Sequence, residues 1–269
     1  MTILLFLRPY KTRTNMLEDK FKEFVAIVKK LRQECPWDKE QTYDSIKSNT
    51  LEEAYEVVEA IDNKDYQELK KELGDLFLHI LFHAQIAEEN NHFTLSDVID
   101  SINEKLIRRH PHVFGDITVT GADHVKTNWE AIKLTEGRSS VLEGVPINMP
   151  SLYRAFRLQE KASKVGFDWE KKEDVWKKVI EEIEEMHVSE REETREELEK
   201  EIGDVFFAMV NYSRFLKINP EDALRRANEK FIKRFSFVEK KVIETGKKIS
   251  ESNLTEMDVF WNESKNDIK

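Results

Sequence analysis

The sequence predicts an all-α protein built from two copies of one helical unit. Apolar residues recur at helical spacing along most of the chain, a set of carboxylates repeats in register, and helix-breaking residues are few. Only 8 of the 269 residues are glycine and 6 are proline, whereas charged residues make up 36%. This composition is typical of helices with solvated faces. We therefore expect two bundles, each of about four helices.

Helical patterns fill most of the first half. The apolar residues of the first helix share one face until Pro36 breaks it. Residues 48–50, Ser-Asn-Thr, are good N-cap residues followed by acids, which predicts a helix start there. The pair His110-Pro111 stops the last helix of this half. The expected helices span residues 16–35, 48–61, 66–89 and 98–109.

Residues 111–150 form the least helical part of the chain. They hold four of the eight glycines and three of the six prolines, which predicts a linker with a short helix near Trp129. Before Met16 the apolar run is only five residues long, too short for a signal peptide or a membrane span. The predicted division is a disordered leader at 1–15, a first helical domain at 16–115, the linker at 116–150 and a second helical domain at 151–269.

The net charge disfavours one class of partner, and the cysteine content indicates a compartment. The formal net charge of -10 disfavours duplex nucleic acid, because phosphate contacts need a basic face. The lone cysteine, Cys35, permits no intramolecular disulfide and is typical of a reducing compartment. We expect a cytoplasmic protein with neither a membrane nor duplex nucleic acid as its partner.

An internal repeat is the strongest feature of the sequence. ELKKELGDLF at 68–77 returns as ELEKEIGDVF at 197–206, an offset of 129 residues, and NEKLIRR at 103–109 returns as NEKFIKR at 228–234. We infer an internal duplication. At the offset of 129, six residues keep their identity: Glu52, Glu53, Glu56, Glu72, Gly74 and Asp75 correspond to Glu181, Glu182, Glu185, Glu201, Gly203 and Asp204.

The repeated carboxylates predict a metal site. Glu182 and Glu185 lie three apart on one helix, and Glu201 and Asp204 lie three apart on the next, so each pair shares a face. The turn between the helices is short enough to make them antiparallel, which would bring all four carboxylates together. Crowded carboxylates repel one another and lose hydration unless a divalent cation such as Mg²⁺, or Mn²⁺ in its place, neutralises them. The alternative is a set of ordinary surface acids in a glutamate-rich chain.

Two further features are repeated with the carboxylates. A glycine weakens a helix interior, so we expect the repeated glycine to allow close approach by a neighbouring helix, with space for a ligand as the alternative. Lys230 and Arg234 lie four apart, as do Lys105 and Arg109, and two cations on one face suit a polyphosphate bound beside a metal. The alternative for these cations is ordinary surface charge.

Other candidate residues have simpler explanations. His79 and His83 have a metal-compatible spacing, but the second half has Ala208 and Tyr212 there, which favours a core role. HPHVFGD, at 110–116, is absent from the second half and is interpreted as a structural loop.

Aromatic residues begin each half. Trp37 in the first half, and Phe167 and Trp169 in the second, either anchor a helix end or stack on a base.

The carboxylate pattern does not match a di-iron bundle. Such a bundle would pair Glu with Glu-x-x-His, whereas here the residue at i+3 is Glu or Asp. A non-catalytic nucleotide sensor or interaction scaffold is the remaining alternative, but it leaves the duplicated carboxylates unexplained.

Extended motifs in both halves carry a family resemblance. CPWDKEQT, LEEAYEVVEAI, ELGDLF and RRHPHVFGD, followed by VGFDW, EEIEE, EIGDVFFAMVN and ANEKFIKRF, closely resemble the MazG nucleoside triphosphate pyrophosphohydrolases from residue 16 to the C-terminus. The resemblance implies an all-α NTP pyrophosphatase fold and a homodimer in which helices of paired subunits complete the bundles. It also implies Mg²⁺-dependent hydrolysis of an NTP or dNTP to the monophosphate and pyrophosphate, with the second half active.

The resemblance further implies roles for individual residues. Glu181, Glu182 and Glu185 would be catalytic, and Glu181 is our candidate for the general base. The implied metal ligands are Glu182, Glu185, Glu201 and Asp204. The implied nucleotide contacts are Lys178, Glu181, Lys200, Asp204, Lys230, Lys233, Arg234 and Trp261. The first half keeps an equivalent set, so loss of ligands does not make it silent: Glu52, Glu53, Glu56, Glu72, Asp75, Lys105 and Arg109.

Overall fold

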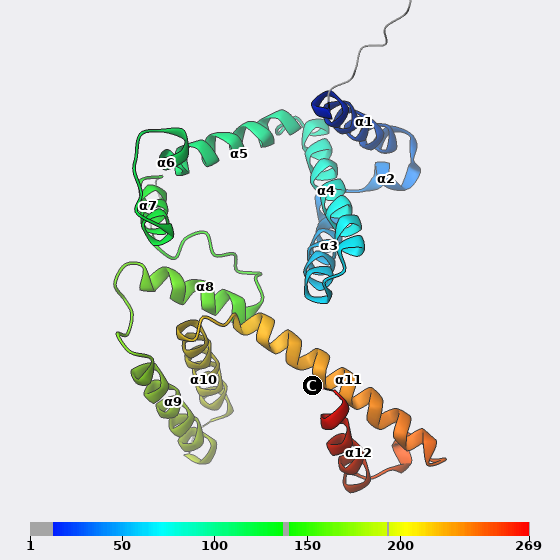
Figure 1. Ribbon diagram of the computed structural model, residues 1–269, viewed down its shortest axis with the longest axis vertical. Helices are drawn as coiled ribbons and strands as arrows, with labels where there is room; N and C mark the ends of the chain where they lie inside the picture. The colour runs from blue at the N-terminus through cyan, green and yellow to red at the C-terminus, as the bar shows by residue number, and fades with distance from the viewer. Residues whose placement is uncertain (1–12, 137–139, 193, 269) are drawn as a thin grey trace, which may run out of the picture. The chain divides into compact units, whose positions relative to one another are not determined.

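The computed structural model describes residues 13–136, 140–192 and 194–268, and every regular element in these ranges is a helix (Figure 1). The predicted all-α class is confirmed. The chain divides into two compact units, Met1–Thr118 and Val119–Lys269. The expected leader lies outside the described residues except for 13–15, which already belong to the first helix. In the described ranges, no helix is long and apolar enough to cross a membrane.

The first unit is organised around a helical hairpin. α3 (Tyr43–Asn63) and α4 (Tyr66–Glu89) pack against each other, and the turn between them uses Lys64 in the left-handed region, with φ 57°. Asp65 then caps α4, because its carboxylate accepts hydrogen bonds from the backbone N–H groups of Gln67 and Glu68, both at 3.0 Å. The helices of this unit are α1 (Arg13–Glu34), α2 (Pro36–Glu40), α3 (Tyr43–Asn63), α4 (Tyr66–Glu89), α5 (Leu95–Arg109) and α6 (Pro111–Phe114).

Helix α3 begins earlier than the sequence pattern predicts. Its N-cap is Thr42, whose hydroxyl accepts from the backbone N–H of Ser45 at 3.2 Å, while the Ser45 hydroxyl accepts from the backbone N–H of Thr42 at 2.9 Å. This reciprocal capping box starts the helix before the predicted cap at 48–50, so that prediction was wrong. Thr50 lies inside the helix and donates its hydroxyl hydrogen to the carbonyl oxygen of Ile46 at 3.1 Å.

The buried core of the first unit joins α1 to the hairpin. It consists of Val28 from α1, Ile46 from α3, and Leu81, Phe82 and Ile86 from α4. These core residues of α4 lie toward its C-terminal end. The N-terminal part of α4, which carries the repeated carboxylates, faces α3.

The second unit contains the other copy of the hairpin. α9 (Lys172–Glu192) and α10 (Arg195–Phe215) pack against each other, and α10 also packs against α8 (Ser151–Ser163). α11 (Pro220–Glu244) packs mainly against α12 (Leu254–Asp267) and α8 (Figure 1). Thr194 caps α10 by accepting from the backbone N–H of Glu197 at 3.4 Å. The short helix expected near Trp129 is α7. The helices of this unit are α7 (Ala122–Thr135), α8 (Ser151–Ser163), α9 (Lys172–Glu192), α10 (Arg195–Phe215), α11 (Pro220–Glu244), the 3₁₀ helix η1 (Ile249–Glu251) and α12 (Leu254–Asp267).

Candidate active site

A trio of carboxylates forms the centre of the candidate site in the second unit. Glu182 and Glu185 share a face of α9, and Glu201 meets them from the antiparallel α10. One oxygen of each side chain lies within 4.8 Å of the others. Glu182 is 8% exposed, so at least one of these carboxylates is largely removed from water. The three oxygens are placed closely enough to bind one cation.

Lys178 supplies the positive charge next to the trio. Its Nζ lies 2.6 Å from a carboxylate oxygen of Glu181 and 2.6 Å from one of Glu182, one turn further along α9. Hydrogen bonds to these two carboxylates raise the pKa of the Lys178 ammonium. Desolvation raises the pKa of the Glu185 carboxyl, Lys178 lowers it, and the neighbouring Glu182 raises it again. Lys178 is therefore a fixed cation at the edge of a carboxylate-rich site.

A cavity of about 400 Å³ adjoins the trio inside the second unit. Lys178, Glu182 and Asp204 are among the residues that line it. Asp204 thus faces the same space as the trio, although it is not one of the three residues whose oxygens converge within 4.8 Å. The remaining lining residues are Leu142, Leu158, Gln159, Ala162, Phe167, Trp169, Val175, Phe207, Ala208, Asn211 and Arg214.

Three polar residues of this cavity were not predicted from the sequence. Arg214 forms an ion pair with both carboxylate oxygens of Asp168, one at 2.9 Å, which ties α10 to the loop before α9. The Arg214 Nε also donates to Oδ1 of Asn211 at 3.0 Å. Gln159 of α8 donates from Nε2 to the carbonyl oxygen of Phe207 at 2.8 Å. Asn211 could have been found, because it is an amide within the apolar run FFAMVNYSRF.

The first unit holds an equivalent trio. Oxygens of Glu53, Glu56 and Glu72 lie within 4.8 Å of one another between α3 and α4. Glu72 is 8% exposed, and burial together with hydrogen bonds to Glu68 and Glu56 raises the pKa of its carboxyl to about 7. Burial also raises the pKa of Glu53, with further contributions from nearby acids that include Asp75. The repeat therefore brings the same three glutamates together in each half, and their roles stay a prediction.

The surroundings of the two trios differ. At the offset of 129 residues, Lys178 corresponds to Asn49, and Ala208 in the cavity corresponds to His79. His79 Nε2 lies 3.7 Å from a carboxylate oxygen of Glu53. Burial lowers the pKa of this imidazole, so it is mainly neutral at pH 7. The first trio thus has a neutral imidazole where the second has the small Ala208 and open space. It has an asparagine where the second has the Lys178 ammonium.

His79 and His83 are held in place by hydrogen bonds and ring stacking. The Thr50 hydroxyl lies 3.3 Å from Nδ1 of His79 and 2.9 Å from Nε2 of His83. The ring of Tyr43 stacks on His83 with the centroids 6.0 Å apart. This packing agrees with the core role expected for the two histidines. HPHVFGD forms the short helix α6 and the turn after it.

Apart from Lys178, the cations predicted along the nucleotide do not belong to the described lining of the cavity. Arg234 of α11 donates to the carbonyl oxygen of Ile268 at 2.9 Å, and Trp261 of α12 packs on Phe231 with ring centroids 5.4 Å apart. Lys230 and Lys233 are exposed on α11, and none of these side chains lines the cavity among the described residues. Elsewhere, Lys200 pairs with Glu197 at 2.7 Å, and Lys105 and Arg109 lie on α5.

The structure corrects the interpretation of the repeated glycines. A Cβ atom added to Gly74 or Gly203 would meet no described atom within 4 Å. Close packing of a neighbouring helix within the chain therefore does not explain these glycines, and the expectation of such packing was wrong. The space that each glycine leaves beside the carboxylates keeps the ligand alternative open.

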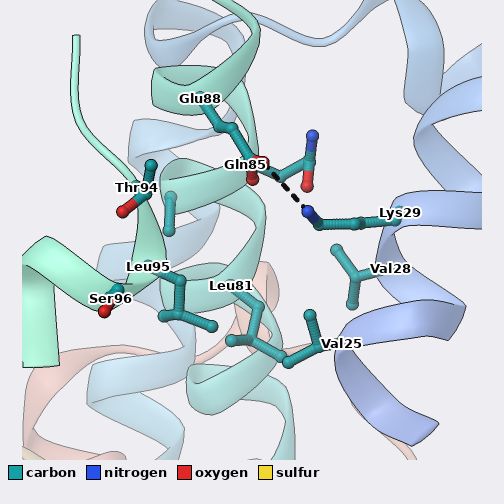
Figure 2. Close-up of a pocket in the computed structure, with 10 residues that line it drawn as sticks. Val25, Val28, Lys29, Leu81, Gln85, Glu88, Thr94, Leu95 and Ser96 are labelled. Atoms are coloured by element: carbon teal, nitrogen blue, oxygen red, sulfur yellow. Dashed lines mark hydrogen bonds and ion pairs between the residues drawn. The ribbon is translucent and has the colours of Figure 1, made fainter. Parts of the chain in front are cut away.

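A smaller cavity in the first unit is separate from the carboxylates. It has a volume of about 170 Å³ and lies between α1, α4 and the start of α5 (Figure 2). Figure 2 shows Val25, Leu81 and Leu95 around it, with Lys29 bonded to Glu88 at 3.0 Å on one side. None of the trio glutamates lines it. We interpret it as an imperfection of core packing.

Comparison with known families gives the same assignment for both hairpins. The model of the MazG nucleotide pyrophosphohydrolase domain matches residues 41–114 and again residues 170–238, more than half of the chain. Each match contains one carboxylate trio. The helical fold, the paired trios and this match define an all-α nucleotide pyrophosphohydrolase. The chain belongs to the MazG family.

Curated relatives extend over nearly the whole chain. A nucleoside triphosphate pyrophosphohydrolase/pyrophosphatase MazG of Thermotoga maritima is 45% identical over 250 residues, which cover 91% of this chain and 95% of the relative. A nucleoside triphosphate pyrophosphohydrolase of Escherichia coli K12 is 41% identical over 250 residues, covering 90% and 95%. An uncharacterized protein of Bacillus subtilis, YabN, is 45% identical over 256 residues, covering 93% of this chain and 52% of the relative.

Proposed function

We propose that the second half of the chain hydrolyses nucleoside and deoxynucleoside triphosphates to the monophosphate and pyrophosphate, with Mg²⁺ as cofactor. The observation that carries this proposal is that Glu182 belongs both to the carboxylate trio and to the lining of the aromatic cavity. A metal-bound triphosphate needs the first feature and a nucleobase needs the second. The names of the relatives from T. maritima and E. coli support the same substrate class.

The donor set of the trio suits Mg²⁺, with Mn²⁺ as the alternative. Glu182, Glu185 and Glu201 offer only oxygen ligands, which hard divalent cations prefer, and Asp204 at the cavity end would complete the set. When bound, the metal would neutralise charge on the triphosphate and lower the pKa of the attacking water. The buried position of Glu182 would exclude bulk water from one side of the reaction.

Glu181 is our candidate for the general base. Its carboxylate lies outside the trio and is exposed, and Lys178 fixes its position through a hydrogen bond of 2.6 Å. In the proposed reaction Glu181 accepts a proton from water as the water oxygen attacks the α-phosphorus. The bond between that phosphorus and the bridging oxygen then breaks, and pyrophosphate leaves with the electron pair.

The cavity would hold the nucleobase. Phe167 and Trp169 offer aromatic surfaces at its wall, where a planar base can stack. Asn211 is buried and its Oδ1 already accepts from Arg214, which leaves the amide hydrogens of Nδ2 for a ligand. Lys178 and Glu182 also line the cavity, so the phosphates would point toward the trio.

We infer a cytoplasmic homodimer in which the second subunit contributes the cations of α11. In one chain, α11 packs on α12 and α8, and its Lys230 and Lys233 remain exposed. Phe206 of α10 and Phe231 of α11 also expose more than half of their surface. Burial of such side chains favours association. A partner helix laid on α9 and α10 would cover the apolar surface and bring basic residues to the triphosphate.

The first half is proposed to bind a cation without hydrolysing nucleotides. It keeps the trio but has Asn49 in place of the lysine, and His79 replaces the small Ala208 that lines the second cavity. Retained ligands with altered surroundings explain why a complete carboxylate set need not mean a second active site.

Two matched substitutions test which half is active. Glu185→Ala removes one ligand of the second trio, and Glu56→Ala removes the equivalent ligand of the first. We expect Glu185→Ala to lower kcat by at least about 100-fold and Glu56→Ala to leave kcat within about threefold of the wild type. Pyrophosphate release from each NTP in the presence of Mg²⁺ is the measurement. Equal losses in the two variants would refute the assignment to the second half.

A further inference from the structure

A buried lysine outside the carboxylate site holds one wall of the cavity. Lys161 lies on α8 and is 4% exposed, although lysine is almost never fully buried unless it is paired. Its Nζ donates to the carbonyl oxygen of Val141 at 3.2 Å and to that of Glu143 at 2.9 Å. These two carbonyls belong to the segment that precedes α8. The ammonium therefore clamps the backbone of this segment to the helix.

The clamped segment contributes directly to the cavity. Leu142 lies between the two bonded residues and lines the cavity that adjoins Glu182. The segment is a turn rather than a helix, with Gly144 in the left-handed region at φ 80°. Backbone outside regular helices has fewer internal hydrogen bonds to hold it, so bonds from a buried ammonium have a large effect on its position.

Helix α8 is tied to α10 by a second buried polar side chain. Gln159, two residues before Lys161, donates to the carbonyl oxygen of Phe207 on α10 at 2.8 Å. Phe207 also lines the cavity. Residues two apart on a helix point to different sides, so α8 fixes α10 with one side chain and the segment at 141–143 with the other. Both ties therefore hold backbone next to residues that line the cavity.

We propose that Lys161 is a positioning residue of the nucleotide site, which acts through Leu142 and sets the wall against which the nucleobase rests. This inference rests on the proposed function of the second half. Lys161 is not among the lining residues, and the two carbonyls that it binds flank Leu142, which is. Its loss should therefore weaken binding of the nucleotide while the chemical step is kept.

The test combines three variants of the full-length chain. Lys161→Met removes the ammonium and keeps an unbranched side chain, Lys161→Arg keeps a cation with N–H donors, and Leu142→Ala removes the wall side chain itself. KM and kcat for an NTP are measured with Mg²⁺, and the Kd of a non-hydrolysable α,β-methylene NTP analogue is measured by calorimetry. Circular dichroism and Tm report whether each variant is folded.

We expect Lys161→Met to raise KM and the analogue Kd about tenfold, with kcat within about twofold of the wild type. Leu142→Ala should raise both constants about three- to tenfold, and Lys161→Arg should lie closer to the wild type than Lys161→Met. If Lys161→Met does not fold, Leu142→Ala decides alone. Unchanged KM and Kd in Leu142→Ala, or a fall in kcat at constant KM in Lys161→Met, would overturn the inference.

The wild-type controls separate this inference from the proposed function. A wild type that binds the analogue but releases no pyrophosphate would refute the proposed hydrolysis, and the Kd values would still test Lys161. A wild type that neither binds the analogue nor releases pyrophosphate would refute both.

Discussion

The ammonium nitrogen of Lys178 lies 2.6 Å from a carboxylate oxygen of Glu182, its neighbour one turn along α9. In the first unit the equivalents of Lys178 and Glu182 are Asn49 and Glu53, and among the described residues Glu53 pairs with the neutral His79 at 3.7 Å and with no lysine or arginine. The trio of the second unit thus has a lysine ammonium paired with it, and the trio of the first unit does not. The two sites should differ in affinity for added cations.

Lys178→Met should strengthen metal binding at the second trio and weaken nucleotide binding. Removal of the ammonium leaves Glu182 without its ion pair, so an added Mn²⁺ meets less competition, whereas a triphosphate loses a cationic partner. We expect the Kd for Mn²⁺ to fall and KM for the NTP to rise, each by about tenfold. Titration with Mn²⁺ followed by electron paramagnetic resonance measures the former.

Asn49→Lys provides the reciprocal change in the first unit. The new ammonium would stand one turn before Glu53 and compete with a metal there. Weaker Mn²⁺ binding at the first site, with NTP hydrolysis unchanged, is the expected result. If Asn49→Lys and Lys178→Met both left Mn²⁺ titrations unchanged, the lysine would have no part in tuning the two sites.

Ala208→His should close the second cavity in the way that the first unit suggests. His79 occupies the equivalent position there, and Ala208 lines the cavity beside Glu182. We expect KM to rise at least about tenfold because the imidazole takes the space of the base. Mn²⁺ binding should persist, since the trio is untouched. Met209→His, at an exposed neighbour that does not line the cavity, is the matched control, and equal effects would argue against the cavity as the base site.

Stability of the first unit should depend on pH through Glu72. The pKa of its carboxyl is raised from 4.5 to about 7. Because the folded state binds this proton more tightly than the unfolded state, the associated stabilisation is complete below about pH 4.5 and is lost as the pH rises through about 7. Without metal, Glu72→Gln should raise Tm relative to the wild type at about pH 8 and have little effect at about pH 4.5.

Calorimetric melts in EDTA at both pH values measure this difference. The exposed Glu23→Gln, on α1, serves as a control and should show no such dependence. Added Mg²⁺ should raise Tm at about pH 8 in the wild type more than in Glu72→Gln, since a cation that binds only the folded state stabilises it. A Glu72→Gln variant that is less stable at both pH values would contradict the assignment.

Glu181→Gln should abolish turnover and preserve binding. The amide cannot accept the proton of the attacking water, yet it retains the size and the hydrogen bond acceptor of the carboxylate near Lys178. We expect kcat to fall by about 100-fold or more, with the Kd values of Mg²⁺ and the NTP analogue little changed. Loss of Mg²⁺ binding would instead make Glu181 a metal ligand.

Local sequence patterns predicted much of the fold. Helix α4 spans Tyr66–Glu89 as expected, because Asp65 supplies a strong cap and the apolar residues keep one period throughout. The start of α3 was missed, because Ser48, Asn49 and Thr50 are good caps in isolation and only the reciprocal bonds of Thr42 and Ser45 decide between the sites. N-cap propensity alone does not decide between two candidate starts of a helix.

The parts of the candidate site differ in how far local sequence patterns determine them. The convergence of Glu182, Glu185 and Glu201 follows from helix periodicity and one tight turn, so the sequence predicts it. The contribution of Leu142 and Lys161 to the cavity depends on how a non-helical segment returns to α8, which no periodic pattern encodes. The open space beside Gly203 likewise depends on the tertiary arrangement of the helices, which leaves this glycine uncovered.

Identification of the products by ³¹P nuclear magnetic resonance tests the proposed reaction most directly. The wild-type chain is incubated with an NTP and Mg²⁺, and the resonances are followed over time. We expect pyrophosphate and the nucleoside monophosphate to appear together in equal amounts, and neither to appear with Glu185→Ala. Orthophosphate with the nucleoside diphosphate, or no product at all, would contradict hydrolysis between the α- and β-phosphates by the second carboxylate trio.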